Sequence, residues 1–147
     1  MTRRSLLVAS LAAVLRADSE DDTWDLVASA ARALVEATAL PPPNRGTAAP
    51  FLSYFDPKMP GYETLRDNVI ALIEQADLQS SIDPLRNEGN DRVREMTLDW
   101  LLTMSDPGSG IVATRREAEI RCRAEKQGKK WRIVSLEPVS FFASPHA

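Results

Sequence analysis

A largely regular alternation of apolar and polar side chains between residues 92 and 104 constrains this fold more than any other feature of the sequence. Successive side chains of a strand point to opposite faces of a sheet, so the alternation predicts one long strand with a buried face and a solvated face. The predicted strand is longer than the roughly five or six residues of a typical strand. We therefore expect the sheet to bend or twist around the elements that cover its apolar face. The apolar set is Met96, Leu98, Trp100, Leu102 and Met104.

The residues before position 77 follow the period of a helix instead. Apolar side chains such as Trp24, Val27 and Leu34 recur at steps of three and four and predict a helix over residues 22–39. The prolines at 41–43 end it, because proline lacks an amide hydrogen and disfavours the helical region for the residue before it. The same signals predict a short helix after Thr47 and a third from about residue 60 to residue 76.

Three further stretches alternate and are separated by turn-rich segments. They predict strands over residues 78–83, 118–124 and 130–136, the first of them ended by Pro84. Adjacent strands with one apolar and one charged face are typical of a half-buried antiparallel sheet. The fold class is therefore α+β, with the N-terminal helices packed on the apolar face of the sheet.

The first 17 residues have the pattern of an export signal. Arg3 and Arg4 precede an apolar run from Leu6 to Leu15, and a small residue, Ala17, precedes an acidic cluster. The run is shorter than the roughly 20 residues that span a bilayer. The arginine pair resembles a twin-arginine signal. We expect a signal peptide over residues 1–17 and one domain over residues 18–147, exported to the periplasm or secreted, without a stable membrane anchor after cleavage. If residues 1–17 are not a signal, the protein is cytoplasmic.

Charge and cysteine content exclude several classes of function. Removing residues 1–17 leaves 15 basic against 21 acidic residues, a net charge of −6. Nucleic acids are bound mainly by Lys and Arg, so we expect no nucleic-acid partner. Cys122 is the one cysteine, the sequence has no metal-ligand spacing, and no glycine-rich loop precedes a helix to hold a phosphate. We therefore expect no metal and no cofactor, and we interpret Cys122 as a small buried strand residue.

The predicted order is helices followed by a meander of long strands. Trp100 and Trp131 lie on the second and fourth strands, and Phe141-Phe142 follow the last strand. This pattern resembles the nuclear transport factor 2-like superfamily, which includes SnoaL-like proteins. The resemblance covers most of the chain after the signal. It implies a strongly curved sheet that wraps the helices into a cone, whose open end is a pocket for a small molecule. Members include isomerases, dehydratases and accessory binding domains, and relatives often pair through the outer side of the sheet. A fold of this kind hosts many unrelated functions.

Asp56 is the candidate catalytic residue. It lies in the loop before the third predicted helix, near the expected mouth of the cone, where it would act as a general base with Tyr54 or Tyr62 donating to an oxyanion. The favoured interpretation is structural, because Asp before a proline commonly turns the chain. His146, the one histidine, lies next to the C-terminus, where we expect a solvated tail.

The candidate pocket combines apolar walls with a few polar anchors, as ligand sites usually do. We interpret the two tryptophans as core residues first and as pocket walls second, because aromatic stripes are most often core. The candidates are Tyr54, Met59, Tyr62, Met96, Trp100, Arg115 and Trp131.

Three functions remain open at this point. The leading hypothesis is an exported, non-enzymatic or accessory domain that holds a small apolar ligand or a partner segment in the cone. The second is an acid/base isomerase or dehydratase resembling ketosteroid isomerase, with Asp56 as the base. The third is a structural module whose cone is filled by its own side chains and which forms a homodimer through the outer sheet face.

N-terminal sequencing of the protein from the exported fraction of its host tests the signal. We expect the mature chain to begin at or near Asp18. A mature chain that begins at Met1 would contradict the prediction.

Overall fold

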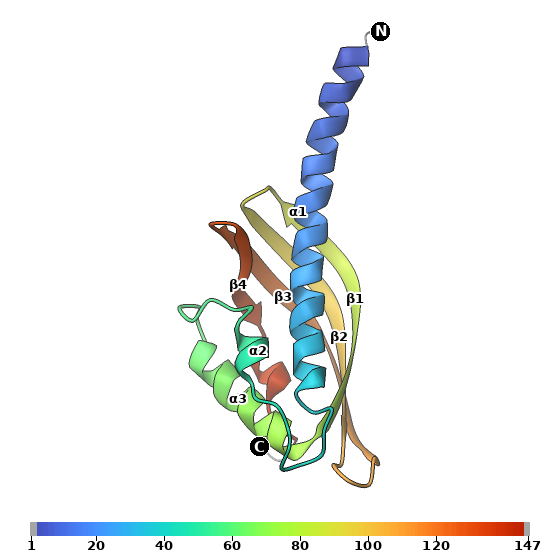
Figure 1. Ribbon diagram of the computed structural model, residues 1–147, viewed down its shortest axis with the longest axis vertical. Coiled ribbons are helices and arrows are strands. Elements are labelled where there is room, and N and C mark those ends of the chain that lie inside the picture. The colour runs from blue at the N-terminus through green and yellow to red at the C-terminus, as the bar shows by residue number, and fades with distance from the viewer. Residues whose placement is uncertain (1–2, 146–147) are drawn as a thin grey trace.

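The computed structural model describes the backbone of residues 3–145 and the side chains of residues 18–112 and 114–145. Three α-helices come first, then four strands, then a short 3-10 helix (Figure 1). Their bounds are α1 Arg3–Glu36, α2 Ala49–Leu52, α3 Tyr62–Gln75, β1 Asp77–Gly89, β2 Val93–Ser105, β3 Val112–Gln127, β4 Lys130–Glu137 and η1 Val139–Phe142.

The strands form one antiparallel sheet in the order β1-β2-β3-β4, as the alternation predicted. The sheet curves, and α1 lies across its concave side, with α2 and α3 beside it (Figure 1). Every member of the apolar set of β2 is at most 2% exposed. The predicted α+β class, with helices in the concave face of a curved antiparallel sheet, is therefore confirmed.

Helix α1 is longer than predicted, since it begins at Arg3 rather than near residue 22 and ends at Glu36. Residues 3–36 contain no proline or glycine, so nothing in the sequence breaks the helix between the predicted signal and the domain. Its N-terminal part extends beyond the sheet (Figure 1). Among the side chains that the structure describes, the first buried one is Ser19. No helix within the described residues is long and apolar enough to span a membrane.

Strand β1 continues past Pro84, where the sequence predicted its end. Pro84 pairs with Leu98 and Arg86 with Thr97, so Leu85 is an extra residue in a β-bulge. Proline is tolerated in this position because β1 is an edge strand and a bulge interrupts the hydrogen-bond ladder there. The bulge reverses the alternation, so that Asn87, opposite Met96, faces the concave side.

That reversal ties the first hairpin of the sheet to α1. The side-chain amide of Asn87 donates to Thr23 Oγ1 at 2.9 Å, and Thr23 is fully buried. Arg94, which is 5% exposed, donates from Nε to Asn87 Oδ1 at 2.6 Å. These bonds fix the turn of α1 at residues 19–23 against the hairpin.

The concave interior is filled by aromatic rings from three elements. Trp100 of β2 lies 5.2 Å from Phe142 of η1, centroid to centroid, in an edge-to-face arrangement, and Phe142 lies 5.6 Å from Phe51 of α2. Phe55 and Phe141 complete this aromatic cluster, in which no ring is more than 3% exposed. Such pairs add about 0.5–1.5 kcal/mol each beyond the area that they bury.

Truncation of Phe142 tests the cluster. We expect Phe142→Ala to lower the free energy of unfolding by about 3–5 kcal/mol, because it opens a cavity against three other rings, those of Phe51, Trp100 and Phe141. Leu40→Ala is the control, since Leu40 is 58% exposed and its truncation should cost about 0.5 kcal/mol or less. Urea unfolding followed by circular dichroism measures both. Equal losses in the two variants would show that the cluster does not stabilise the interior.

Candidate functional site

The seven predicted pocket residues do not come together in the structure. Met59, Met96 and Trp100 are at most 5% exposed and belong to the hydrophobic core. The indole N–H of Trp100 donates to Ser80 Oγ at 2.7 Å, so its polar atom is satisfied inside the protein. Tyr62 opens α3 and packs, half-buried, against the core.

Arg115 lies on the other side of the sheet. It is exposed and pairs with Thr103, whose neighbours Leu102 and Met104 point into the core. Arg115 therefore belongs to the convex face, and the concave side presents Arg116 in its place. The alternation along β3 agrees with this, because Arg115 is an even number of residues from the exposed Glu117 and Glu119 and an odd number from the buried Ile120.

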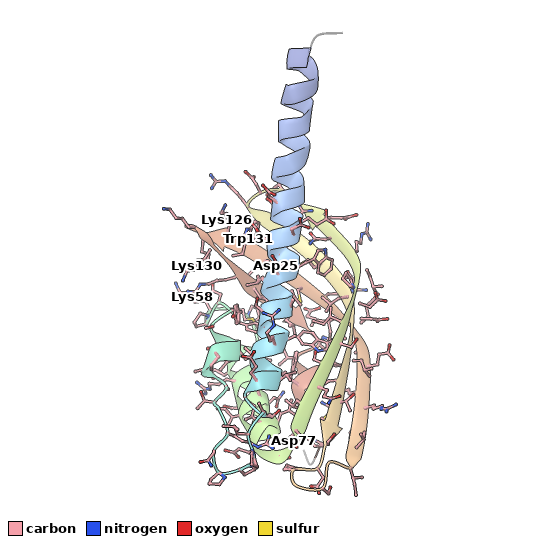
Figure 2. The ribbon with its side chains drawn as sticks, turned by 45° about the vertical axis from the view of Figure 1, so that its right-hand side comes forward. Asp25, Lys58, Asp77, Lys126, Lys130 and Trp131 are labelled. Atoms are coloured by element: carbon pink, nitrogen blue, oxygen red, sulfur yellow. The ribbon has the colours of Figure 1, made fainter. Side chains whose placement is uncertain are left out.

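The two remaining candidates, Tyr54 and Trp131, line a common groove. Its walls are the first packed turns of α1, the residues directly after α2, and the start of β4 (Figure 2). The groove encloses about 630 Å³ and is the largest of the described cavities. Its lining residues are Asp22, Asp25, Leu26, Ser29, Ser53, Tyr54, Lys129, Lys130, Trp131 and Arg132.

A second β-bulge brings Trp131 to this position. Arg123 pairs with Ser135 and Ala124 with Ile133, so Val134 is an extra residue in β4. Simple alternation would place Trp131 and Leu136 on opposite faces, whereas the bulge lets both face inward. At the mouth of the sheet Trp131 is directly opposite Lys126.

Trp131 carries a buried donor without an acceptor. Its indole Nε1 is inaccessible to solvent, and no hydrogen-bond partner exists for it among the described residues. Leaving a buried N–H unpaired costs about 1–3 kcal/mol, so such groups are rare and call for an explanation. Trp100 differs in this respect because Ser80 accepts its hydrogen bond.

Residues 54–56, which follow α2, cover the outer edge of β4. Ile133 N donates to Tyr54 O at 2.9 Å, and Asp56 N donates to Ile133 O at 2.9 Å. These bonds form a short parallel bridge between Phe55 and Ile133. They fix Tyr54 beside Trp131 and leave no free edge on this part of β4.

Asp56 is positioned as a turn residue. Its carboxylate accepts a hydrogen bond from the backbone N–H of Lys58 at 2.9 Å and another from Gln127 Nε2 at 2.8 Å. The Lys58 bond, and then the Gln127 bond, hold the pKa of Asp56 below its ordinary value of 3.8. A general base for proton abstraction needs a pKa moved toward neutrality, which is the opposite direction. Asp56 also does not line the groove.

Cys122 and the described acidic residues were the remaining candidates for a reactive or metal-binding site. Burial raises the pKa of the Cys122 thiol to about 12, so it stays protonated and unreactive. Within the part of the chain whose side chains are described, no three His, Cys, Asp or Glu residues gather to hold a metal ion. His146 lies outside the described residues.

The charged residues of the groove were not among the predicted site residues. Lys129, Lys130 and Arg132 flank Trp131 in the sequence directly after the turn at Gly128, which is the signal that pointed toward them. Asp22 and Asp25 lie in the first turn of the helix that the sequence predicts over residues 22–39. Their meeting with β4 depends on how α1 crosses the sheet.

Comparison with solved structures identifies the architecture. A nuclear transport factor 2-like superfamily protein from Salmonella enterica serovar Typhimurium LT2 superimposes with a TM-score of 0.63 over 82% of this chain and 89% of its own, at 12% sequence identity. The chain has a nuclear transport factor 2-like fold. At this identity the likeness concerns the fold alone.

Two further solved structures are similar over most of their length. One is a protein of unknown function with a cystatin-like fold from Nostoc punctiforme PCC 73102, with a TM-score of 0.49, 17% identity, and 86% and 93% of the two chains covered. The other is a SEC-C motif containing protein from Rhodopseudomonas palustris, with a TM-score of 0.45, 15% identity, and 80% and 89% covered. No protein-family model matches the sequence, and no curated protein matches it at a significant level.

The stability of Asp56→Asn as a function of pH tests the role of this residue in the nuclear transport factor 2-like fold. A carboxylate whose pKa is lower in the folded state stabilises the protein above its unfolded pKa, and this contribution is lost as the pH falls through the folded pKa. We therefore expect Asp56→Asn to be less stable than wild type at pH 7, and the difference to shrink below about pH 3.8. Urea unfolding at pH 7 and pH 3 measures it. A difference that grows on acidification would contradict this role.

Proposed function

We propose that this chain is a non-catalytic binding domain that holds a small ligand or a partner segment in the groove between α1 and β4. The observation that carries the proposal is the unpaired, buried indole N–H of Trp131 at the largest described cavity. Trp131 as a whole is only partly buried, so a small turn of the indole would bring this N–H to an acceptor on a ligand in the groove. Pockets for small ligands usually have volumes of roughly 300–1,000 Å³, a range that includes this groove.

The proposed site is not in the interior of the cone, where the resemblance led us to expect it, because side chains fill that interior. Trp100 and Phe142 occupy the concave side where a cone-shaped pocket would lie. A ligand in that position would have to displace rings of the aromatic cluster. The groove at the mouth needs no such displacement.

The enzymatic alternative has less support. Its candidate base, Asp56, has a lowered pKa and bonds to Lys58 and Gln127, both of which favour the carboxylate form. Such a carboxylate is a weak base at neutral pH. The hydrogen bonds instead explain Asp56 as a residue that fixes the loop after α2.

Export is part of the proposal. The sequence of residues 1–17 motivates it, and cleavage after Ala17 would keep every contact that α1 makes through Ser19 and Thr23. The mature domain would therefore retain the bonds that fix α1 against the first hairpin.

A structural dimer is the alternative that one observation favours. Asp83, Asp99 and Glu119 lie directly opposite one another across three strands, on the face of the sheet that points away from α1. Like charges in opposed positions destabilise a sheet. Arginines of a second copy, such as Arg121, would neutralise this row across an interface of the two convex faces.

Native mass spectrometry of protein purified from its own host tests the proposal. We expect a retained small-molecule or peptide mass on the wild type, its loss in Trp131→Ala, and its retention in Trp24→Ala. Trp24 is the matched control, a partly buried tryptophan of α1 that does not line the groove.

Two outcomes of this experiment count against the groove. Retention of the extra mass by Trp131→Ala would place the ligand elsewhere. A dimer mass with nothing retained would favour the structural alternative instead.

A further inference from the structure

The charges around the groove are sorted by sign onto its two walls. Asp22 and Asp25 project from α1, three residues apart and therefore on one helix face. Lys129, Lys130 and Arg132 line the opposite wall, at the turn before β4 and along the strand (Figure 2). The apolar surface between them comes from Leu26, Tyr54 and Trp131.

None of these five charged side chains forms an ion pair within the described part of the chain. Arg132 donates to the carbonyl of Ser53 at 3.5 Å, which is a long contact with a neutral acceptor. Arg132 also acts electrostatically on the Asp56 carboxylate, whereas Asp22, Asp25, Lys129 and Lys130 have no ion-pair partner among the described residues and remain available to a ligand.

Strand β3 arranges the charges along its convex face differently from the groove. Signs are mixed along that strand, and neighbours pair: Arg121 with Glu119 at 3.9 Å, and Arg123 with Glu125 at 3.6 Å. Such pairs neutralise one another locally. The groove has the opposite arrangement, with like charges side by side and unlike charges across a gap.

Two walls of opposite sign favour a ligand that carries both charges. An anion near Lys130 gains from the basic wall but is repelled by Asp25 if nothing neutralises that carboxylate, and a cation meets the reverse problem. A ligand with an ammonium at one end and a carboxylate at the other pairs with both walls at once. A carboxylate oxygen or a carbonyl on it also offers an acceptor to the indole N–H of Trp131, once the indole turns that buried atom toward the groove.

We propose that the groove binds a small zwitterion with an apolar body, the chemistry of a free amino acid or a short peptide with free termini. Asp22 and Asp25 hold the ammonium, Lys129, Lys130 and Arg132 hold the carboxylate, and Leu26 and Trp131 contact the apolar group. This inference rests on the proposed function, because it specifies the ligand of the same groove.

Isothermal titration with the dipeptide Ala-Phe tests it, alongside the same dipeptide N-acetylated, C-amidated, and blocked at both ends. We expect each single block to weaken binding about three- to tenfold, since each removes one charge-assisted contact, and the double block to reduce binding further.

Charge-removing variants assign the two ends. In Asp22→Asn/Asp25→Asn, N-acetylation should no longer weaken binding, whereas C-amidation still should. In Lys129→Gln/Lys130→Gln the pattern should reverse. All four side chains are exposed, so these substitutions preserve the packed core. Glu119→Gln/Arg121→Gln on the convex face is the control and should bind all four probes as the wild type does.

The possible failures separate this inference from the proposed function. If all four probes bind equally and Trp131→Ala abolishes that binding, the groove binds ligands but the zwitterion inference is overturned. The same holds if no probe binds while native mass spectrometry finds a retained uncharged ligand that Trp131→Ala loses. If no probe binds and no ligand is retained, both are overturned.

Discussion

Burial of Trp100 inside the curved sheet is the interaction on which the rest of the structure depends. Its ring contacts Phe141 and Phe142, which η1 brings back over the concave face after β4 has ended. Arg116 holds η1 in place by donating to the carbonyls of Phe141 and Ala143 at 2.7 and 2.6 Å. These two bonds hold η1 and the residues after it against the concave face of the sheet. The rings of Phe141 and Phe142 therefore fill the interior. The interior is thereby closed, and the largest of the described cavities lies toward the mouth.

Two single-residue insertions decide which side chains reach that mouth. The bulge at Leu85 turns Asn87 inward, where it binds Thr23 and supports Arg94. The bulge at Val134 turns Trp131 inward while Leu136 still reaches the core. Without the first, the start of α1 would lose its polar attachment to the sheet. Without the second, Trp131 would point away from the groove, and Tyr54 would be the one aromatic residue among the described residues that line it. The site is therefore a consequence of local irregularity in an otherwise regular meander.

The long strand was predictable because its period is set by burial alone, and the helix α3 because its apolar stripe is flanked by clear start and stop signals. Pro84 was misread as a strand end, since the sequence does not reveal that β1 is an edge strand with a bulge. The convex position of Arg115 could have been predicted, since alternation along β3 puts it on the same face as Glu117 and Glu119. Trp131 and Tyr54 were identified as candidates from the sequence. Asp22 and Asp25 of α1 were not, because they come near Trp131 only through the way in which α1 packs across the sheet.

Hydrogen exchange at the indole N–H of Trp100, followed by ¹⁵N NMR, tests the closed interior most directly. The donor is bonded to Ser80 Oγ inside a ring cluster that is at most 3% exposed. Exchange should therefore occur only by global unfolding, with an opening free energy equal to that from urea denaturation. Exchange of this proton within minutes under native conditions would show an open cone that admits solvent, and would contradict the account.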